Sequence, residues 1–576
     1  MEETPVKNPI TPPDSSHSSN LSNPSPVSSF DESSPILGDL KPFSLNPPDK
    51  VILVLVFAIS FLAVFLPDRG FYGLSWDEAY YYKPSREAAS WLYRVLLTKD
   101  RSLSRENLDA SWEEIRELPS VVKILLGSSS LMFEKWLGQL PAFRLPSALA
   151  YSLTLVLIYL LIFPSSGRYA ALFSVFSYGL MPRIFGHAHI GASESITVFM
   201  ILLVFYCFIK GLASARWSLL LGIAFGLSLN TKINCVFLPF ILLPWAHLFH
   251  RKKYMNNFFA MVFLSPLVMI AAWPWLWRDT ARRVLEYFYF FASHQFTAVY
   301  YFGRKYNYGS TLAPWHYPFV MILFTIPSLI QVFMGMGIIA SLRSIRTKPL
   351  FVLFLWAAFF TLFVSALPAS PKYDGIRLFI PAFLFLSLLA GAGISWIMEY
   401  AGKCNISSPL KKLIPWLGIA LLVGNGILAV GKSRTCPLSY FNIFAGGLPG
   451  AYKKGMETTW WGEAVNDDVL KALNELPQGA KVKTLALHDE VFRLLQDWGR
   501  LRPDLNINST NPPYDYHLLL VRKGFFSRPE WCLYLTWPRL KVFEHNSVPL
   551  VILFKTGADF EKAWPQIQIP QKAPKS

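Results

Sequence analysis

A series of long apolar stretches, separated by short polar loops, is the feature that most constrains this chain. About eleven of them approach the ~20 residues that a helix needs to cross the hydrocarbon of a bilayer. Hydrophobic residues make up 53% of the chain and charged residues 16%, a balance that soluble domains do not usually carry. The sequence therefore predicts a mainly α, polytopic membrane protein. The apolar stretches are residues 51–66, 146–163, 169–182, 195–213, 218–230, 233–249, 255–275, 317–342, 350–367, 378–398 and 413–430.

Basic residues in the loops indicate how the chain is oriented. Short cytoplasmic loops are enriched in Lys and Arg. With the N-terminus in the cytoplasm, the loops that carry Arg168, Arg216, Arg251, Arg343 and Lys411 all fall on the cytoplasmic side. An odd number of spans then exports the C-terminal part. Membrane topology thus explains much of the formal net charge of +17, and nucleic acid is not an expected partner.

Composition divides the chain into three parts. Residues 1–49 are rich in Ser, Pro and Asn and predict a disordered cytoplasmic tail. Residues 50–430 hold the predicted spans and a large extracytoplasmic loop at 67–145. Residues 431–576 alternate helical patterns with short apolar runs, which predicts a small extracytoplasmic α/β domain. Among the five cysteines, only Cys436 and Cys532 in this last part are candidates for a disulfide.

The predicted outward-facing loops carry the residues with the most evident chemical potential. Several also have a simple structural explanation. Arg144 and Arg377 begin spans and can extend their charges to the membrane surface, while His316 beside Trp315 suits an interface anchor. Lys232 is harder to explain in this way, because an unpaired ammonium between two short spans is costly. The candidates are Asp77, Glu78, Glu117, Lys123, Arg144, His187, His189, Glu194, Lys232, His316, Tyr373 and Arg377.

The acids among these candidates allow more than one interpretation. Asp77 and Glu78 follow the first span and are either a solvated turn or a site for proton transfer, cation binding or sugar binding. Glu194 suits a helix cap as well as a catalytic role. His187 and His189 are too few to hold a metal unless Glu78 or Glu194 joins them.

Taken together, the acids and cations fit an inverting displacement at the anomeric carbon of a sugar. A carboxylate accepts the proton of the acceptor, and fixed positive charge stabilises the departing phosphate. A lipid-linked donor explains why such a site lies at a membrane. A transport pathway more naturally places its charges inside the spans.

With these features the chain resembles the C-type membrane glycosyltransferases (GT-C) of the dolichyl-phosphate-mannose protein mannosyltransferase type, which include the bacterial aminoarabinose transferases that act on lipid A. The resemblance covers roughly residues 50–430, and its motifs are loose but share one order and one side of the membrane. The residues that carry it are Asp77-Glu78, Pro119 to Lys123, Arg144-Leu145-Pro146-Ser147, Pro182 to Glu194, Thr231-Lys232, Pro314 to Pro318 and Tyr373 to Arg377.

The resemblance implies roles for these residues. Asp77 is the expected catalytic base, and Glu78 a neighbour that orients it or a cation. Glu194 matches a second acid that is usually Asp in these proteins. The residues expected to bind the lipid phosphate are Arg144, Lys232 and Arg377. The remaining candidates are expected to line the pocket: Glu117, Lys123, His187, His189, His316 and Tyr373.

One segment departs from the family pattern. Leu118 and Ser120 stand where a His-Pro-Pro-x-x-Lys element has its first His and its second Pro, which puts a metal or phosphate role for this segment in question. Glu117 and Lys123 still supply charge there. Some relatives hold a divalent cation and others do not, so the resemblance leaves a metal open.

The leading hypothesis is a membrane glycosyltransferase that moves a sugar from a polyprenyl-phosphate-linked donor to a protein or glycolipid acceptor on the extracytoplasmic face. The alternatives are a transporter or flippase of lipid-linked glycans, and a non-catalytic membrane scaffold that displays the C-terminal domain. The expected location is a bacterial inner membrane, because residues 431–576 contain neither a repeat of the β-trefoil kind nor a retention signal. The sequence names neither the sugar nor the acceptor.

Overall fold

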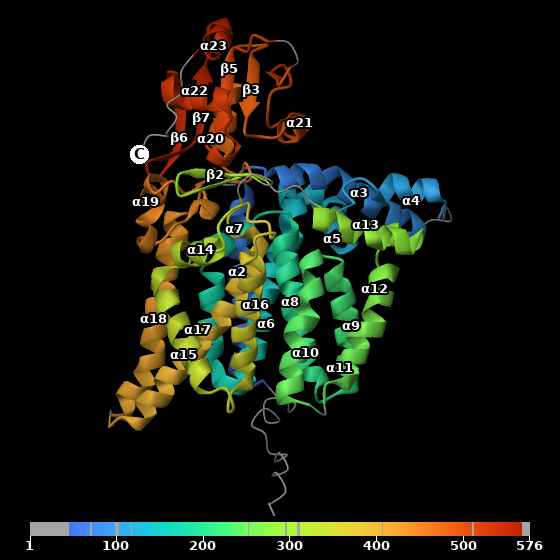
Figure 1. The fold of residues 1–576 in the computed structure, drawn as a ribbon, viewed down its shortest axis with the longest axis vertical. Helices are drawn as coiled ribbons and strands as arrows, with labels where there is room; N and C mark the ends of the chain where they lie inside the picture. The colour runs from blue at the N-terminus through green and yellow to red at the C-terminus, as the bar shows by residue number, and fades with distance from the viewer. Residues whose placement is uncertain are drawn as a thin grey trace, which may run out of the picture.

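The computed structural model describes residues 45–69, 72–97, 103–116, 118–251, 253–293, 297–307, 312–405, 407–509 and 512–566. Within them, a helix bundle lies beneath a layer of helices that run across its end, and an α/β domain stands beyond that layer (Figure 1). The predicted class is confirmed in its main features, because the described chain is mainly helical and ends in a small mixed sheet.

Each predicted apolar stretch forms helix. Six of the described helices are long and apolar enough to cross a membrane, and four apolar helical stretches are shorter. The number of crossings remains a prediction. The bundle consists of α2 (Pro47–Phe65), α6 (Gln139–Gly179), α8 (Ser193–Gly211), α9 (Ala215–Leu229), α10 (Leu238–Phe249), α11 (Met255–Phe259), α12 (Ser265–Ala271), α14 (Tyr317–Thr325), α15 (Ser328–Arg343), α16 (Pro349–Ala366), α17 (Ile380–Lys403) and α18 (Ser408–Lys432); the 3₁₀ turn η2 (Ile233–Phe237) precedes α10, and a π-helical turn (Ala260–Leu264) joins α11 to α12.

Three boundaries differ from the prediction. The stretches 146–163 and 169–182 are joined as α6, whose backbone breaks at Gly167 with φ +77°, a conformation that glycine adopts without strain. The stretch 317–342 is two helices, because Pro327 forces the preceding residue, Ile326, into an extended conformation. The predicted tail lies outside the described residues up to residue 44, and α2 already begins at Pro47.

The centre of the bundle is α17, and small residues bring its neighbour α15 close. A Cβ added to Gly337 would lie 1.7 Å from the Leu389 carbonyl oxygen, and one added to Gly393 would lie 2.3 Å from the Phe333 carbonyl oxygen. Such close approach of helix backbones is a common basis of packing in membranes, where apolar side chains gain little by leaving lipid. By contrast α2 lies at the edge of the bundle, with Val54 66% and Ile59 64% exposed.

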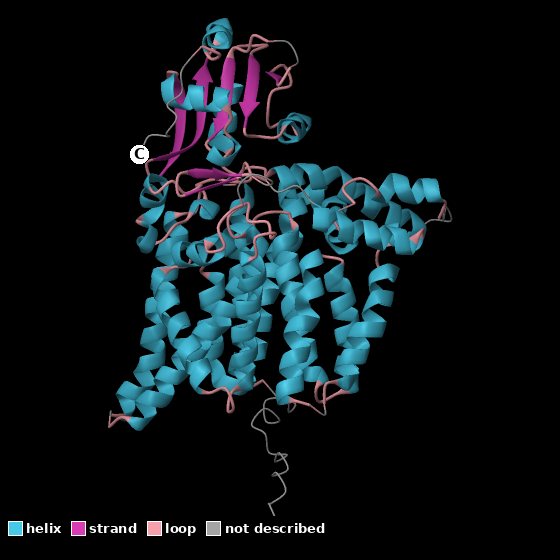
Figure 2. Cartoon of the chain, in the orientation of Figure 1, coloured by secondary structure: helices cyan, strands magenta, loops and turns pink. Residues whose placement is uncertain are grey.

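The layer over the bundle comes mostly from the large first loop. Its helices run across the end of the bundle (Figure 2). Its elements are η1 (Leu66–Arg69), α3 (Trp76–Leu97), α4 (Arg105–Trp112), α5 (Ser120–Leu137), α7 (Pro182–Ala188), η4 (Pro274–Trp277), α13 (Thr280–Ser293) and the hairpin of β1 (Val299–Tyr301) and β2 (Arg304–Tyr306).

The C-terminal domain is built on one mixed sheet with the strand order β4-β3-β5-β7-β6. Strand β3 is parallel to β4 and β5, and β7 is antiparallel to β5 and β6. The predicted apolar runs form β3, β5 and β7. The strands are β3 (Lys481–Leu485), β4 (Asn506–Ile507), β5 (Tyr516–Leu520), β6 (Arg539–His545) and β7 (Val548–Lys555), and the helical elements are η6 (Pro437–Ser439), η7 (Ile443–Ala445), α19 (Gly447–Lys453), α20 (Asp467–Asn474), α21 (Asp489–Asp497), η8 (Lys523–Phe525), α22 (Arg528–Thr536) and α23 (Gly557–Ala563).

The predicted candidate disulfide is not formed. Cys436 and Cys532 are both buried free thiols. They belong to different hydrophobic clusters, Cys436 to the main core shared with the bundle and Cys532 to a separate cluster around α22. Each thiol is therefore held by packing and not by a covalent bond.

Candidate active site

Asp77 lies in the first turn of α3, at the end of the bundle that faces the C-terminal domain. The start of this helix is held by that domain, because the Trp76 N–H donates a hydrogen bond to the Trp461 carbonyl. The Asp77 carboxylate accepts a hydrogen bond from the Tyr81 hydroxyl at 3.2 Å. Its side chain keeps 11% of its surface exposed, so the carboxylate is almost buried but not sealed.

Arg377 stands among three carboxylates. Its Nη2 pairs with Asp77, 300 positions earlier in the chain, its Nε donates to Glu194 Oε1 at 2.9 Å, and its Nη1 donates to Asp374 Oδ2 at 3.1 Å. The Lys232 ammonium also donates to Glu194 Oε1, at 2.7 Å. We call these five residues the Arg377 network. It unites α3, the first turn of α8, the turn before η2, and the loop that leads into the 3₁₀ turn η5 (Arg377–Phe379).

The C-terminal domain extends this network. The Trp461 indole N–H donates to Asp374 Oδ2 at 2.9 Å, and the Arg377 guanidinium lies 4.4 Å from the centre of the Trp461 ring. Arg522, which is fully buried, lies 2.8 Å from Asp374 Oδ1 and donates to the Trp460 carbonyl at 2.7 Å. The domain therefore contributes an aromatic wall and a third cation to the cluster.

Glu78, the neighbour of Asp77, lies in a separate and closed arrangement. Arg144 donates to it from Nε at 2.6 Å and from Nη2 at 2.9 Å, and the Gly191 N–H donates at 2.7 Å. The Ser75 N–H and hydroxyl donate to Oε2, each at 3.0 Å. Both charged side chains are 0% exposed. We call Glu78 and Arg144 the closed pair. The Arg144 side chain has no exposed surface in this arrangement, and its predicted role in phosphate binding stays a prediction.

Burial shifts the pKa of three groups in or beside the network. It raises the pKa of Asp77 above its ordinary value, and the positive charge of Arg377 opposes that rise. It lowers the pKa of His187 to about 4 and raises the pKa of Tyr373 to about 12. At neutral pH the His187 ring and the Tyr373 hydroxyl are therefore uncharged, and the network supplies the charges.

The structure brings together Asp77, Glu194, Lys232 and Arg377 of the predicted residues. His187 stands beside them, with its ring edge-on to Trp461 at 5.2 Å. His189 is fully buried, and its ring packs against Tyr72 at 4.2 Å and Phe185 at 4.7 Å. His189 therefore contributes to the packing behind the network.

Other predicted pocket residues lie elsewhere. His316 Nδ1 forms a hydrogen bond with the Tyr301 hydroxyl at 2.9 Å, next to the β1 to β2 hairpin. The Lys123 ammonium is buried and donates to the backbone carbonyls of Trp112 at 3.2 Å and Glu114 at 2.6 Å, so it fixes the end of α4 against α5. In this structure Lys123 has a structural contact, and its place in the pocket stays a prediction. Glu117 lies outside the described residues.

Three residues of the cluster were not among the predicted site residues. Asp374 lies between Tyr373 and Arg377, and only its neighbours were chosen. Trp461 and Arg522 come from residues 431–576, which the sequence predicts as a domain of their own. Trp461 could have been found from the sequence, because a pair of Trp residues precedes Gly and Glu in the segment Thr458 to Glu463 of the predicted exported domain. No comparable pattern surrounds Arg522.

Within the described part of the chain, no group of three or more His, Cys, Asp or Glu side chains is arranged to hold a metal ion. The acids that come together here are joined by a guanidinium, since Arg377 contacts Asp77, Glu194 and Asp374. In this arrangement these residues do not fit a divalent cation.

Two cavities of different character adjoin the network. An apolar groove of about 60 Å³ lies between α8, α10, α16 and α17, and Asn234 and Leu378, close in sequence to Lys232 and Arg377, contribute to its lining. A cavity of about 10 Å³, lined in part by His187, Asp374 and Trp461, has room for at most one water molecule. The network is therefore compact where it meets the C-terminal domain and adjoins apolar space within the bundle.

This architecture defines a class: a multi-pass membrane protein with a charged cluster where one end of the helix bundle meets an α/β domain. Residues 130–277 match the family model described as Dolichyl-phosphate-mannose-protein mannosyltransferase. The resemblance predicted from the sequence, to GT-C membrane glycosyltransferases of this type, is confirmed. The matched segment contains Arg144, Glu194 and Lys232, while Asp77 and Arg377 lie outside it.

The chain is also similar to solved structures. The crystal structure of ArnT from Cupriavidus metallidurans in the apo state has a TM-score of 0.50 and 16% identity, covering 88% of this chain and 98% of that chain. The same protein bound to undecaprenyl phosphate gives a TM-score of 0.47 at 16% identity over the same shares. The archaeal oligosaccharyltransferase AglB from Archaeoglobus fulgidus, in complex with an inhibitory peptide and a dolichol-phosphate, gives 0.44 at 13% identity, covering 81% and 62%. No curated protein matches the sequence.

Proposed function

We propose that this protein transfers a sugar from a polyprenyl-phosphate-linked donor to a protein or glycolipid acceptor on the extracytoplasmic face of a membrane. The observation that carries the proposal is the convergence of Asp77, Glu194, Lys232 and Arg377 at one end of the bundle, beside an apolar groove. The ligands named in two of the structural relatives are undecaprenyl phosphate and dolichol-phosphate. A donor of this kind has an apolar chain for the groove and a phosphate for the cations.

The donor phosphate is assigned first to Lys232. Its side chain is 17% exposed, and within the described residues its ammonium has one carboxylate partner, Glu194. An ammonium has three N–H donors, so two remain for phosphate oxygens. Arg377 is committed through three nitrogens to Asp77, Glu194 and Asp374. A guanidinium has five N–H donors, so Arg377 contacts phosphate through the two that these bonds leave, or by exchanging one of these carboxylates for it.

Asp77 is assigned as the general base. The acceptor O–H gives its proton to the Asp77 carboxylate while the acceptor oxygen forms a bond to the anomeric carbon, and the bond from that carbon to the phosphate oxygen breaks. Lys232 and Arg377 stabilise the negative charge that the departing polyprenyl phosphate gains. Exchange of Arg377 from Asp77 to the phosphate frees the carboxylate at the moment when it is needed. The raised pKa of Asp77 makes it a stronger base than an exposed Asp.

Purified protein supplied with radiolabelled polyprenyl-phosphate sugars tests this proposal. We expect the wild type to release polyprenyl phosphate and to label an acceptor, and Asp77→Asn to lose about 10²- to 10⁴-fold in rate while it still binds the donor. Asp468→Asn is the matched control, because Asp468 is an exposed acid in the first turn of α20. Unchanged turnover in Asp77→Asn rejects the base. Movement of the glycolipid across sealed vesicles without any labelled product instead identifies a flippase.

A further inference from the structure

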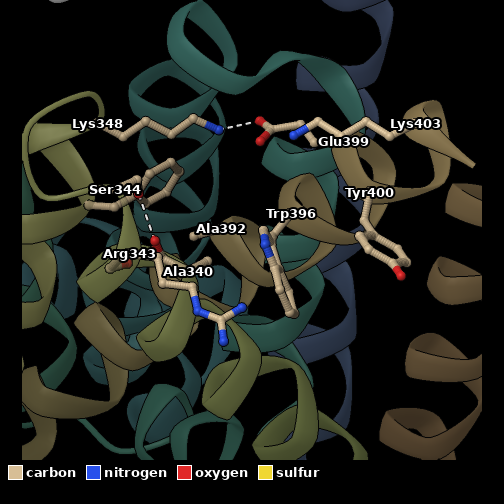
Figure 3. A pocket seen from close by; sticks show the side chains of 11 residues that line it. Ala340, Arg343, Ser344, Lys348, Ala392, Trp396, Glu399, Tyr400 and Lys403 are labelled. Carbon is tan, nitrogen blue, oxygen red and sulfur yellow. Dashed lines mark hydrogen bonds and ion pairs between the residues drawn. The ribbon is translucent and has the colours of Figure 1, made fainter.

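A second polar cavity lies at the opposite end of the bundle from the Arg377 network. It has a volume of about 200 Å³ and sits where α15 ends, α16 begins and α17 ends (Figure 3). These are the helix ends predicted to face the cytoplasm. Its polar and aromatic lining includes Arg343, Lys348, Trp396, Glu399, Tyr400 and Lys403.

The lining is positively charged. Three cations, Arg343, Lys348 and Lys403, share the cavity with one acid, Glu399. Lys348 is paired with Glu399, whereas neither Arg343 nor Lys403 forms an ion pair with any acid in the part of the chain that the structure describes. Figure 3 shows Arg343 beside the Trp396 ring, and its guanidinium carbon lies 5.5 Å from the ring centre. Two cationic side chains are thus available to an anion.

The walls and rim of the cavity are apolar. Ala340, Phe351 and Ala392 line it, and Tyr400, at its edge, is 66% exposed. Next to Arg343 in the chain, Leu342 is 55% and Ile345 is 44% exposed. Exposed apolar side chains at the end of a membrane helix lie among acyl chains, while Tyr and Arg at that depth meet lipid headgroups. The cavity therefore joins cationic groups to a lipid-facing surface.

We propose that this cavity binds the phosphate headgroup of an anionic phospholipid, between Arg343 and Lys403, with the acyl chains along the exposed face of α15. Basic pockets between membrane helices on the cytoplasmic side are suited to such headgroups. A soluble phosphate compound has the same charge but makes no use of Leu342 and Ile345. The site is separate from the Arg377 network, and this proposal does not depend on the proposed transferase activity.

Native mass spectrometry of the full chain in detergent, with phosphatidylglycerol or phosphatidylcholine added, tests the site. We expect one phosphatidylglycerol to bind more tightly than phosphatidylcholine, and Arg343→Gln with Lys403→Gln to weaken phosphatidylglycerol about thirtyfold. The matched control is Arg216→Gln with Arg251→Gln, two exposed cations on the same predicted side that do not line the cavity. If both double variants weaken the binding of phosphatidylglycerol equally, the lipid responds only to the overall charge of the protein, and the proposed site is wrong.

A variant that binds phosphatidylglycerol more tightly distinguishes a change at the site from a loss of folding. Glu399→Gln removes the only acid of the lining and is expected to tighten phosphatidylglycerol about fivefold, which a damaged fold does not produce. Inorganic phosphate, added as a competitor at millimolar concentration, distinguishes the source of the anion. If it displaces phosphatidylglycerol completely, or if phosphatidylcholine binds equally well, the proposal of a lipid site is wrong.

Discussion

Asp77 and Glu78 are adjacent in the sequence but lie in two polar regions of opposite character. Glu78 is in the closed pair, where five hydrogen bonds and full burial leave no surface for a ligand. Asp77 is in the Arg377 network, where 11% of the side chain is exposed and, within the described residues, Glu194 Oε2 has no hydrogen-bond partner. A buried ion pair whose hydrogen bonds are all made holds structure together, whereas a network with unused capacity can accept a ligand.

The largest expected effect comes from breaking the closed pair. Arg144→Met leaves the Glu78 carboxylate buried beside Gly191 with no counterion, and we expect a loss of about 3–5 kcal/mol of unfolding free energy. Thermal unfolding of the purified protein in detergent measures it. Arg282→Met is the control, because Arg282 is 57% exposed and its acid partners Asp279 and Glu286 are 42% and 34% exposed, and about 0–1 kcal/mol is expected there.

A double variant sharpens this result. Replacing both members of the closed pair, as in Glu78→Leu with Arg144→Met, removes the buried charge altogether and is expected to restore much of the stability lost in Arg144→Met. If Arg144→Met is as stable as the wild type and loses only donor affinity, then Arg144 binds the donor as the sequence first indicated, and the contrast between the two regions fails.

The next effect concerns the open side of the network. Lys232→Gln removes an ammonium assigned to the donor phosphate, and we expect KM for the polyprenyl-phosphate donor to rise about 10- to 100-fold with little change in unfolding temperature. Donor titration in the transfer assay measures KM, and Lys232→Arg, which keeps the charge, is expected to recover part of the loss. A fall in stability without a change in KM assigns Lys232 to structure.

Comparison with the sequence shows which of these features can be predicted. Apolar stretches define the helices, and the break before Pro327 is visible because proline restricts the residue before it. The choice of partners is not visible: neither Arg144 nor Arg377 reveals which acid it pairs with, since both begin apolar stretches after an outward loop. Contacts between residues 300 positions apart depend on how the helices pack, which periodicity does not specify.

The role of the C-terminal domain was missed for a related reason. A change of composition near residue 431 correctly indicates a different fold, but it does not indicate that the new domain completes the cluster. Trp461 and Arg522 do so by contacting Asp374. Domain boundaries drawn from composition separate folding patterns, whereas a site between two domains uses residues from both.

A third experiment tests how strongly that domain holds the network. Arg522→Met leaves Asp374 with Arg377 and Trp461 as partners, so we expect a loss of about 2 kcal/mol, smaller than for the closed pair. Thermal unfolding and donor turnover are measured together. Arg493→Met, at a surface ion pair in the same domain where Arg493 is 70% exposed, is the control and should change neither. If Arg522→Met loses as much unfolding free energy as Arg144→Met, then the Arg377 network stabilises the fold in the same way as the closed pair.

The last effect is a dependence of stability on pH at this domain junction, which is gradual because it is spread over the interval between two pKa values. Glu457 accepts a hydrogen bond from the Gly524 N–H at 2.9 Å, and burial raises its pKa from 4.5 to about 7, against the opposing charge of Arg522. Between these two values the folded protein holds a proton that the unfolded chain has released. Stability therefore falls as the pH rises through this window, by at most about 1.4 kcal/mol per pH unit, and is constant above it.

Glu457→Gln isolates this contribution, because the amide oxygen can still accept from Gly524 while the side chain no longer ionises. Unfolding temperatures of the wild type and the variant, measured from about pH 5 to about pH 8, should converge at the acidic end and separate toward the basic end, with the variant more stable there. Other titrating groups contribute equally to both proteins and cancel in the difference. If the unfolding temperatures of the two proteins instead change in parallel with pH, Glu457 is ionised throughout this range. The domain junction then holds a buried carboxylate, as the closed pair does.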